Sequence, residues 1–204
     1  NFGNILAAYY AMKMGLPVNK LICASNENNV LTDFIRTGVY NKNRPFHTTS
    51  SPSMDILVSS NLERLLYDMT GGNDALVGSW MKSLNDVGVY TVSAEVKAKM
   101  DELFYGGYCD EQGTKAAIKE MFETENYLID PHTAVAVNVY QQYLQETGDQ
   151  ETPAIIASTA SPYKFAASVL EALTGEKGQG SEFDKVAELS ALTGTQIPQP
   201  IADL

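Results

Sequence analysis

The residues best placed for chemistry are the first four, Asn1-Phe2-Gly3-Asn4, because they run directly into a helix. The pattern from Ile5 to Met14 is helical, with Ile5, Ala8 and Met12 on one apolar face. Such a helix start presents backbone N–H groups and the positive end of the helix dipole at one point, and phosphate is the usual ligand there. The same residues also suit an ordinary Asn-capped surface helix. The pattern therefore indicates either an anion site or a plain helix cap.

Polar residues at the ends of two strand-like runs form a second group of candidates. Asn26 and Glu27 follow the apolar run Lys20–Ser25, and Ser158 and Thr159 follow the run 152–157. In open α/β sheets, ligand sites are built at the carboxyl ends of strands, so these positions are suitable for a site. Capping of the next helix is the competing interpretation for both pairs. His47 lies in a loop without periodicity and is interpreted as a loop residue.

The elements that position these residues are mostly helices with clear boundary signals. Helical spacing runs from Val30 to Thr37 and stops at Gly38. One further helix is expected to run from Ser93 to Gly106-Gly107, residues 39–53 are expected to form a loop, and residues 197–201 an extended tail. The remaining helices are expected to begin at caps of the Ser, Asp or Asn type, and these caps are Asn73, Asp110, Asp130, Ser161 and Ser181.

Composition excludes some classes of function. The chain has 204 residues and a formal net charge of −11, which argues against a nucleic-acid partner because such binding needs clustered Lys and Arg. No apolar run approaches the roughly 20 residues needed to span a bilayer, so no membrane partner is expected. Cys23 and Cys109 show neither disulfide nor zinc spacing, so we expect a cytoplasmic protein without a metal. Because the chain begins at Asn1 without an initiator Met, we expect an N-terminal part to precede it.

Five blocks of the sequence resemble threonine synthases, which are pyridoxal-phosphate enzymes, and they occur in the family's order. The most distinctive is Ser-Pro-Ser-Met-Asp-Ile-Leu-Val-Ser-Ser-Asn-x-Glu-Arg, residues 51–64. The first block, Asn-Phe-Gly-Asn-Ile-Leu-Ala-x-Tyr-Tyr, resembles the loop that binds the cofactor phosphate. The blocks are residues 1–10, residues 26–38 followed by Tyr40, and residues 51–64, 128–136 and 158–165.

The resemblance implies an α/β fold of the tryptophan-synthase-β-like type, with short parallel strands flanked by many helices. It implies that residues 1–204 are the C-terminal portion of a single pyridoxal-phosphate enzyme whose N-terminal part is missing. The implied reaction is a carbon–oxygen lyase step in threonine biosynthesis. In that reaction O-phospho-L-homoserine loses phosphate and water is added at the β carbon, which gives L-threonine.

By the same resemblance, the backbone N–H groups of Asn1, Phe2, Gly3 and Asn4 hold the cofactor phosphate. A Ser/Thr hydroxyl lies beside the pyridine nitrogen in the family, and the matching residue is Thr159. A neutral hydroxyl hydrogen-bonds an unprotonated ring nitrogen, whereas a carboxylate would favour the protonated ring. For the substrate phosphate and carboxylate, the candidates by position are Ser53, Asp55, Asn61, Arg64 and His132.

The sequence departs from the family pattern in two places. Where Ala-His-Pro is expected after the threonine, this chain has Ala160-Ser161-Pro162, so no histidine acts there. The family's Schiff-base lysine lies upstream of the phosphate loop, and no lysine of this chain stands in a matching motif. Lys164 is interpreted as a solvent-facing helix residue. Because that lysine forms the covalent anchor and moves protons, we expect the 204 residues alone to be inactive.

Two alternatives to the synthase stay open. A threonine or serine dehydratase of the same fold would share the cofactor but act on a substrate without phosphate. A non-catalytic relative that binds a phosphorylated ligand would lack the lysine in the missing part. The Ser-Met-Asp-Ile and Asp-Pro-His-Thr blocks favour the synthase. The oligomeric state stays open, and contact with the missing part is expected to leave apolar surface exposed on this chain.

Overall fold

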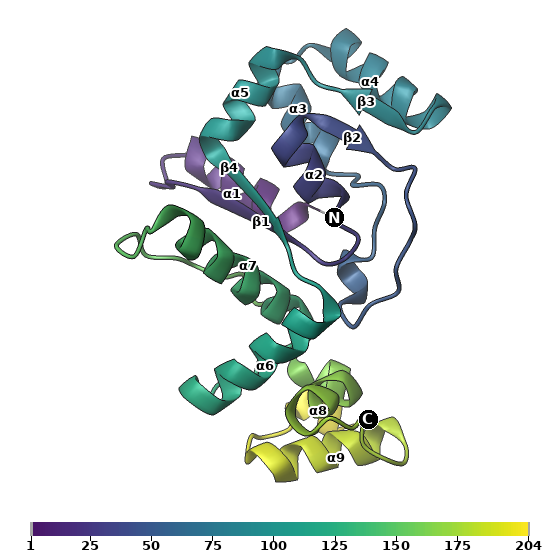
Figure 1. Cartoon of the computed structure of the whole chain (residues 1–204), viewed down its shortest axis with the longest axis vertical. Helices are drawn as coiled ribbons and strands as arrows, with labels where there is room; N and C mark the ends of the chain where they lie inside the picture. Colours follow the sequence, from purple (N-terminus) through teal and green to yellow (C-terminus); the bar gives the residue numbers. More distant parts are fainter. Residues whose placement is uncertain (1, 204) are drawn as a thin grey trace.

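Two parallel strands form the centre of the fold. The computed structural model describes residues 2–203, and in it β1 (Leu21–Ser25) pairs with β4 (Phe104–Tyr108), Cys23 lying opposite Gly106. Helix α2 (Val30–Thr37) covers one face of this pair and helix α7 (Pro131–Thr147) covers the other (Figure 1). The architecture is therefore α/β with short parallel strands among many helices, as the sequence predicts.

Gly106 and Gly107 belong to strand β4, so the prediction that they end a helix is wrong. Helix α5 (Ala94–Leu103) stops before them. A Cβ added to Gly106 would lie 3.1 Å from Ile35 Cβ of α2, and one added to Gly107 would lie 2.6 Å from Val139 Cγ1 of α7. Successive residues of a strand face opposite sides, so the two glycines let both helices approach the strand closely.

Gly107→Ala is expected to lower the free energy of unfolding by about 1–3 kcal/mol, because its Cβ would overlap the fully buried Val139. The measurement is denaturant unfolding of the 204-residue chain. The matched control is Gly107→Ala combined with Val139→Ala, which removes the overlapping methyl group. The double variant should be more stable than the sum of the two single effects. Strict additivity would contradict the steric explanation.

The first 104 residues surround the larger hydrophobic core. The strands β2 (Val39–Asn41) and β3 (Val89–Thr91) pair antiparallel above it, so part of the segment expected to be a loop is a strand. The Tyr40 and Tyr90 rings stack at 5.3 Å with an interplanar angle of 5°, and the Trp80 ring lies 6.2 Å from Tyr90. The core also contains helices α1 (Gly3–Lys13), α3 (Leu62–Met69) and α4 (Asp74–Asp86).

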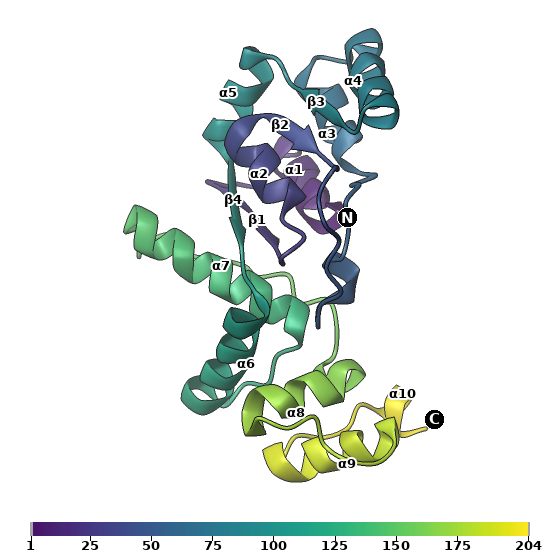
Figure 2. The same cartoon turned by 45° about the vertical axis from the view of Figure 1, so that its right-hand side comes forward.

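A second core joins the C-terminal helices to the rest of the chain. Helix α6 (Glu111–Glu125) packs against α7 and against α8 (Ala166–Thr174), and α9 (Glu182–Thr193) packs on α8 (Figure 2). The turns η1 (Pro52–Met54) and η2 (Pro162–Phe165) are 3₁₀ helices. The expected extended tail is partly wrong, because residues 199–202 form the short helix α10 (Gln199–Ala202).

Most helix boundaries follow the cap signals. Gly38 ends α2 with a φ of 75°. The side chains of Asn73, Ser93, Asp110, Asp130 and Ser181 each accept a hydrogen bond from a backbone N–H of the helix that follows. These predictions are confirmed because a cap needs only contacts within one turn of the chain.

The prediction of a strand at residues 152–157 is wrong for this structure. The segment is irregular, and the Ile155 side chain is 97% exposed. A strand exists only where a neighbouring strand accepts its backbone hydrogen bonds. Within residues 2–203, β1 and β4 pair only with each other, so neither provides a partner for residues 152–157.

Candidate functional site

The N-cap residue of helix α1 makes no side-chain hydrogen bond to the backbone N–H groups at the helix start. Phe2 is the N-cap residue and has the left-handed angles φ 63° and ψ 10°, which are uncommon for a bulky residue. The first intrahelical bond runs from the Leu6 N–H to the Phe2 carbonyl, so the N–H groups of Gly3, Asn4 and Ile5 have no intrahelical acceptor. The first turn holds no acidic residue. Asn1 lies outside the described residues.

Asn61 lies beside this helix start. Its Nδ2 atom is 3.7 Å from the position of a Cβ on Gly3, and Asn61 is itself the N-cap residue of α3. Arg64 is exposed on the first turn of α3, and its backbone N–H donates to the Asn61 carbonyl at 3.2 Å. The structure thus brings two candidate residues, Gly3 and Asn61, together.

Side-chain bonds between α1 and α3 fix the position of these two helices relative to each other. The Tyr9 hydroxyl donates to the Asp68 carboxylate, and Lys13 Nζ lies 2.6 Å from Asp68 Oδ1. Burial alone would raise the pKa of Asp68, but the bonds from Lys13 and Tyr9 outweigh it and keep that pKa below its usual value. The orientation of α1 is therefore set by contacts of Tyr9 and Lys13, in the second half of the helix.

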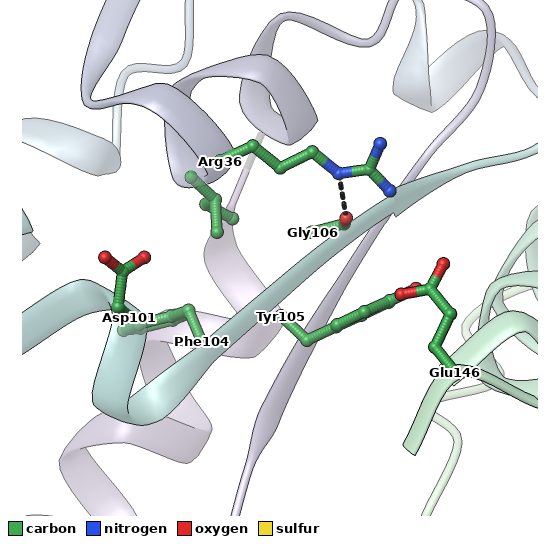
Figure 3. Close-up of a pocket in the computed structure, with 7 residues that line it drawn as sticks. Arg36, Asp101, Phe104, Tyr105, Gly106 and Glu146 are labelled. Carbon is green, nitrogen blue, oxygen red and sulfur yellow. Dashed lines mark hydrogen bonds between the residues drawn. The ribbon is translucent and has the colours of Figure 1, made fainter. Parts of the chain in front are cut away.

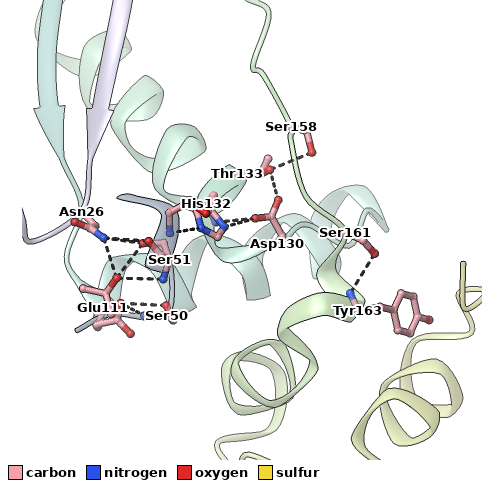
Figure 4. Close-up of polar contacts among 12 residues, drawn as sticks. Asn26, Ser50, Ser51, Glu111, Asp130, His132, Thr133, Ser158, Ser161 and Tyr163 are labelled. Carbon is pink, nitrogen blue, oxygen red and sulfur yellow. Dashed lines mark hydrogen bonds and ion pairs between the residues drawn. The ribbon is translucent and has the colours of Figure 1, made fainter. Parts of the chain in front are cut away.

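The segment before α3 is anchored at the carboxyl end of β1. Asn26 Nδ2 lies 2.7 Å from Asp55 Oδ1. It also lies 3.0 Å from Ser51 Oγ (Figure 4). Asp55 Oδ2 accepts the Thr49 N–H at 3.0 Å, and the Thr49 hydroxyl donates to Asp55 Oδ1 at 2.7 Å. The Asp55 carboxylate is thus bonded both to its own loop and to Asn26.

The carboxyl end of β4 holds the same segment from another side. Glu111, the first residue of α6, accepts hydrogen bonds from the Ser50 N–H at 3.1 Å and the Ser50 hydroxyl at 3.0 Å (Figure 4). Residues that follow β1 and β4 therefore both bond the loop of residues 49–55. This loop lies at the edge of the parallel sheet where ligand sites are built.

His132 is buried, with 6% of its surface exposed, and both ring nitrogens are engaged. The Ser53 backbone N–H donates to Nε2 at 3.1 Å, while Nδ1 lies 2.9 Å from Asp130 Oδ1 (Figure 4). Because Nε2 accepts a bond, it carries no proton, so the ring is neutral with its proton on Nδ1. His132 therefore joins the Ser53 turn to α7, and the Ser53 side chain stays exposed.

Thr159 lies on the exposed segment between α7 and η2. Its neighbour Ser158 lies 3.0 Å from the Thr133 hydroxyl, and the Thr159 hydroxyl makes no hydrogen bond to another residue in the described part of the chain. Lys164 is exposed, as expected.

A separate hollow of about 360 Å³ lies beside the amino-terminal half of β4 (Figure 3). The Tyr105 hydroxyl points toward the Glu146 carboxylate, and burial together with Glu146 raises the pKa of Tyr105 to about 12. Arg36 Nε donates to the Gly106 carbonyl at 2.9 Å. The hollow lies at the opposite end of β4 from Glu111, so it is distinct from the contacts that Glu111 and Asn26 make with the loop of residues 49–55.

Sequence reasoning missed several residues that build this site. Their partners lie far along the chain, and the local motifs give no signal of them. Asp130, which bonds His132 and Thr133, was predicted only as a helix cap. The residues missed are Asn28, Thr49, Glu111 and Thr133. Among residues 2–203, no cluster of His, Cys, Asp and Glu could hold a metal ion, and no helix is long and apolar enough to cross a membrane.

Comparison with known proteins agrees with this fold. Residues 133–200 match the family model of the threonine synthase C-terminal region. The chain is 44% identical over 198 residues to human threonine synthase-like 1, covering 97% of this chain and 25% of that protein. It is 36% identical over 201 residues to threonine synthase of Saccharomyces cerevisiae, covering 92% of this chain and 39% of that protein.

A solved structure gives the same result. The PLP-bound threonine synthase from Brucella melitensis superposes with a TM-score of 0.80 at 34% identity, covering 92% of this chain and 39% of that one. The fold is that of pyridoxal-phosphate enzymes of the threonine synthase type. The resemblance of this chain to the C-terminal part of threonine synthases is confirmed. The chain spans about a quarter to two fifths of the length of these relatives.

Proposed function

We propose that this chain is the C-terminal portion of a pyridoxal-phosphate enzyme that converts O-phospho-L-homoserine and water to L-threonine and phosphate. The observation that carries the proposal is the open start of α1, where the Gly3, Asn4 and Ile5 N–H groups have no intrahelical acceptor. A phosphate group is the ligand that fits such a helix start. The family resemblance supplies the reaction, because an anion site alone would not specify it.

The residues present fit the cofactor phosphate. The left-handed Phe2 followed by helical residues turns successive N–H groups toward one point, and no acidic side chain in the first turn would repel an anion there. Asn1 would complete this group. When bound, the cofactor supplies the electron sink for elimination at the substrate carbon. The chain contributes the binding of its phosphate and the orientation of its ring.

Thr159 is proposed to contact the ring nitrogen. Its hydroxyl is exposed and makes no hydrogen bond to another described residue, so it can bond a ligand. As a neutral group it would leave the ring nitrogen unprotonated. Ser158, the residue before it, is tied to Thr133, which limits the positions that Thr159 can take.

The five candidates for the substrate divide by their position and exposure. Asn61 and the exposed residues Arg64 and Ser53 are proposed to contact the substrate phosphate or carboxylate. Asp55 and His132 are proposed to act indirectly, because their polar atoms already bond the 49–53 loop and Asp130. Arg64 offers the strongest charge for a phosphate, since its planar fork bonds two oxygens at once.

The rest of the enzyme is proposed to supply the lysine that bonds the cofactor and moves the proton. The 204 residues alone would then be inactive. The exposed segment 152–157, with Ile155 at 97%, is proposed to contact that missing part. The buried, unpaired thiols of Cys23 and Cys109 suit the proposed cytoplasmic location, because a reducing compartment keeps such thiols free.

The proposal is tested with the longer protein that contains this chain. Cofactor absorbance is recorded, and phosphate release from O-phospho-L-homoserine is assayed beside keto-acid formation from threonine. Phosphate release with threonine formation supports the synthase. Keto acid without phosphate release would replace it with a dehydratase. Absence of bound cofactor and of turnover would leave a non-catalytic protein that binds a phosphorylated ligand.

A further inference from the structure

The carboxylate of Asp130 lies at a junction between two loops. Asp130 is fully buried and is the N-cap residue of α7. Oδ1 accepts the His132 N–H at 2.9 Å and lies 2.9 Å from His132 Nδ1, while Oδ2 accepts the Thr133 hydroxyl (Figure 4). Each oxygen therefore serves a different side chain.

The Oδ1 side leads to the Ser53 turn. The Ser53 N–H can only donate, so His132 Nε2 accepts and the single ring proton is on Nδ1, directed at Asp130. A protonated Nε2 would face the Ser53 N–H donor to donor. We name the chain Ser53–His132–Asp130 the first arm.

The Oδ2 side leads to the segment that carries Thr159. The Thr133 hydroxyl has one proton, and an ionised carboxylate can only accept, so Thr133 donates to Asp130. Thr133 Oγ1 is also the donor toward Ser158 Oγ, 3.0 Å away, so this one hydroxyl is shared between Asp130 Oδ2 and Ser158. We name the chain Ser158–Thr133–Asp130 the second arm.

Both arms require an ionised carboxylate, and the surroundings favour one. Burial alone would raise the pKa of Asp130, but the bonds from His132 and Thr133 outweigh it and hold that pKa below its usual value. The bonds that His132 and Thr133 make to Asp130 both point their protons toward the carboxylate.

We infer that Asp130 is a positioning residue that fixes the Ser53 turn and the Ser158–Thr159 segment relative to each other through these two arms. The inference rests on the proposed function, in which Thr159 contacts the cofactor and Ser53 lies in the substrate loop. Because Asp130 is fully buried, it would act through His132 and Thr133 and not on a ligand directly. A helix cap alone would need one oxygen, and the second oxygen is what joins the arms.

Asp130→Ser tests this directly, because serine caps a helix about as well as aspartate but offers one oxygen. The matched control is Asp110→Ser at the start of α6, where the Asp110 carboxylate accepts from the Gly113 N–H at 2.7 Å and the residue is exposed. The single-arm variants are Thr133→Val, which keeps the side-chain shape, and His132→Phe. Thr133→Ser keeps the hydroxyl and should restore the second arm.

The first readout is nuclear magnetic resonance of the 204-residue chain. Thr133→Val should lower the backbone order parameters of residues 158–160 only, and His132→Phe those of residues 51–54 only. Asp130→Ser should lower both and disturb the His132 tautomer seen in its ring ¹⁵N shifts, while Asp110→Ser changes neither. Unchanged order parameters in Asp130→Ser would overturn the inference. If that variant unfolds, unchanged residues 158–160 in Thr133→Val would overturn it.

The second readout is kinetics of the longer protein. Asp130→Ser and Thr133→Val should each lower kcat about tenfold or less, the loss of one hydrogen bond, with a smaller effect on KM. Thr133→Ser should restore kcat. Loosened loops with wild-type kcat would overturn the positioning role. If the longer protein lacks the proposed activity, the resonance experiment still decides whether Asp130 joins the loops, so the two failures are distinguishable.

Discussion

Gly3→Asp is expected to weaken cofactor binding by the longer protein by about 100-fold or more. The introduced carboxylate would stand at the first position of α1, where the Gly3 and Asn4 N–H groups have no intrahelical acceptor. Two like charges about 4 Å apart near a protein surface repel by roughly 4 kcal/mol, which is enough for this loss. The measurement is titration of the cofactor against the apoprotein, followed by absorbance.

The same substitution should leave the fold intact or slightly more stable. A negative charge at a helix start interacts favourably with the helix dipole, by about 0.3–1 kcal/mol. Space is no obstacle, because a Cβ at Gly3 would meet Asn61 Nδ2 only at 3.7 Å. Thermal unfolding of the 204-residue chain should therefore show no loss, so that reduced binding cannot come from unfolding. Gly3→Ala is the control and should keep most of the affinity. Wild-type affinity in Gly3→Asp would place the cofactor phosphate elsewhere.

Thr159→Val is expected to lower kcat of the longer protein by about 5- to 150-fold. The variant removes the only hydroxyl proposed for the ring nitrogen, and an unsatisfied buried polar group costs about 1–3 kcal/mol. Valine keeps the shape of threonine, and the exposed Thr159 makes no hydrogen bond within residues 2–203, so the fold should be unaffected. Steady-state assays of phosphate release provide the measurement.

Two further substitutions separate the proposed role from a local structural one. Thr159→Ser keeps the hydroxyl and should stay within a few-fold of wild type. Ser161→Ala removes the nearby side chain that accepts the Tyr163 N–H at the start of η2. It should affect stability more than the cofactor spectrum. Equal activity in Thr159→Val and wild type would remove Thr159 from the site.

Local signals in the sequence are enough to predict the ends of most helices. Asp110 and Asp130 cap α6 and α7, and Gly38 ends α2 in the left-handed region. These predictions succeed because a cap or a glycine stop depends on atoms within about one turn. The helix start at Gly3 and Asn4, where the anion site is proposed, is predictable for the same reason, since it depends on one helix alone.

Whether a segment forms a strand depends on partners that lie far away in the sequence. Gly106-Gly107 looks like a helix end in the sequence, yet it is a strand because β1 pairs beside it and α2 and α7 press on both faces. The opposite error occurs at residues 152–157, where strand-forming residues stay irregular beside no partner. Strand pairing and the close approach of helices to a strand depend on tertiary structure, so the residues of one segment do not predict them.

The sequence by itself therefore determined most helix boundaries, the helix start at which a phosphate site is proposed, and the resemblance to threonine synthases. Tertiary structure alone decided which of the candidate residues already bond other parts of the protein. Asp55 and His132 look alike in sequence to Ser53 and Arg64 as polar loop residues, but their atoms are already bonded to Thr49, Ser53 and Asp130. The physical reason is that a polar atom can serve a ligand only when the fold has not already satisfied it.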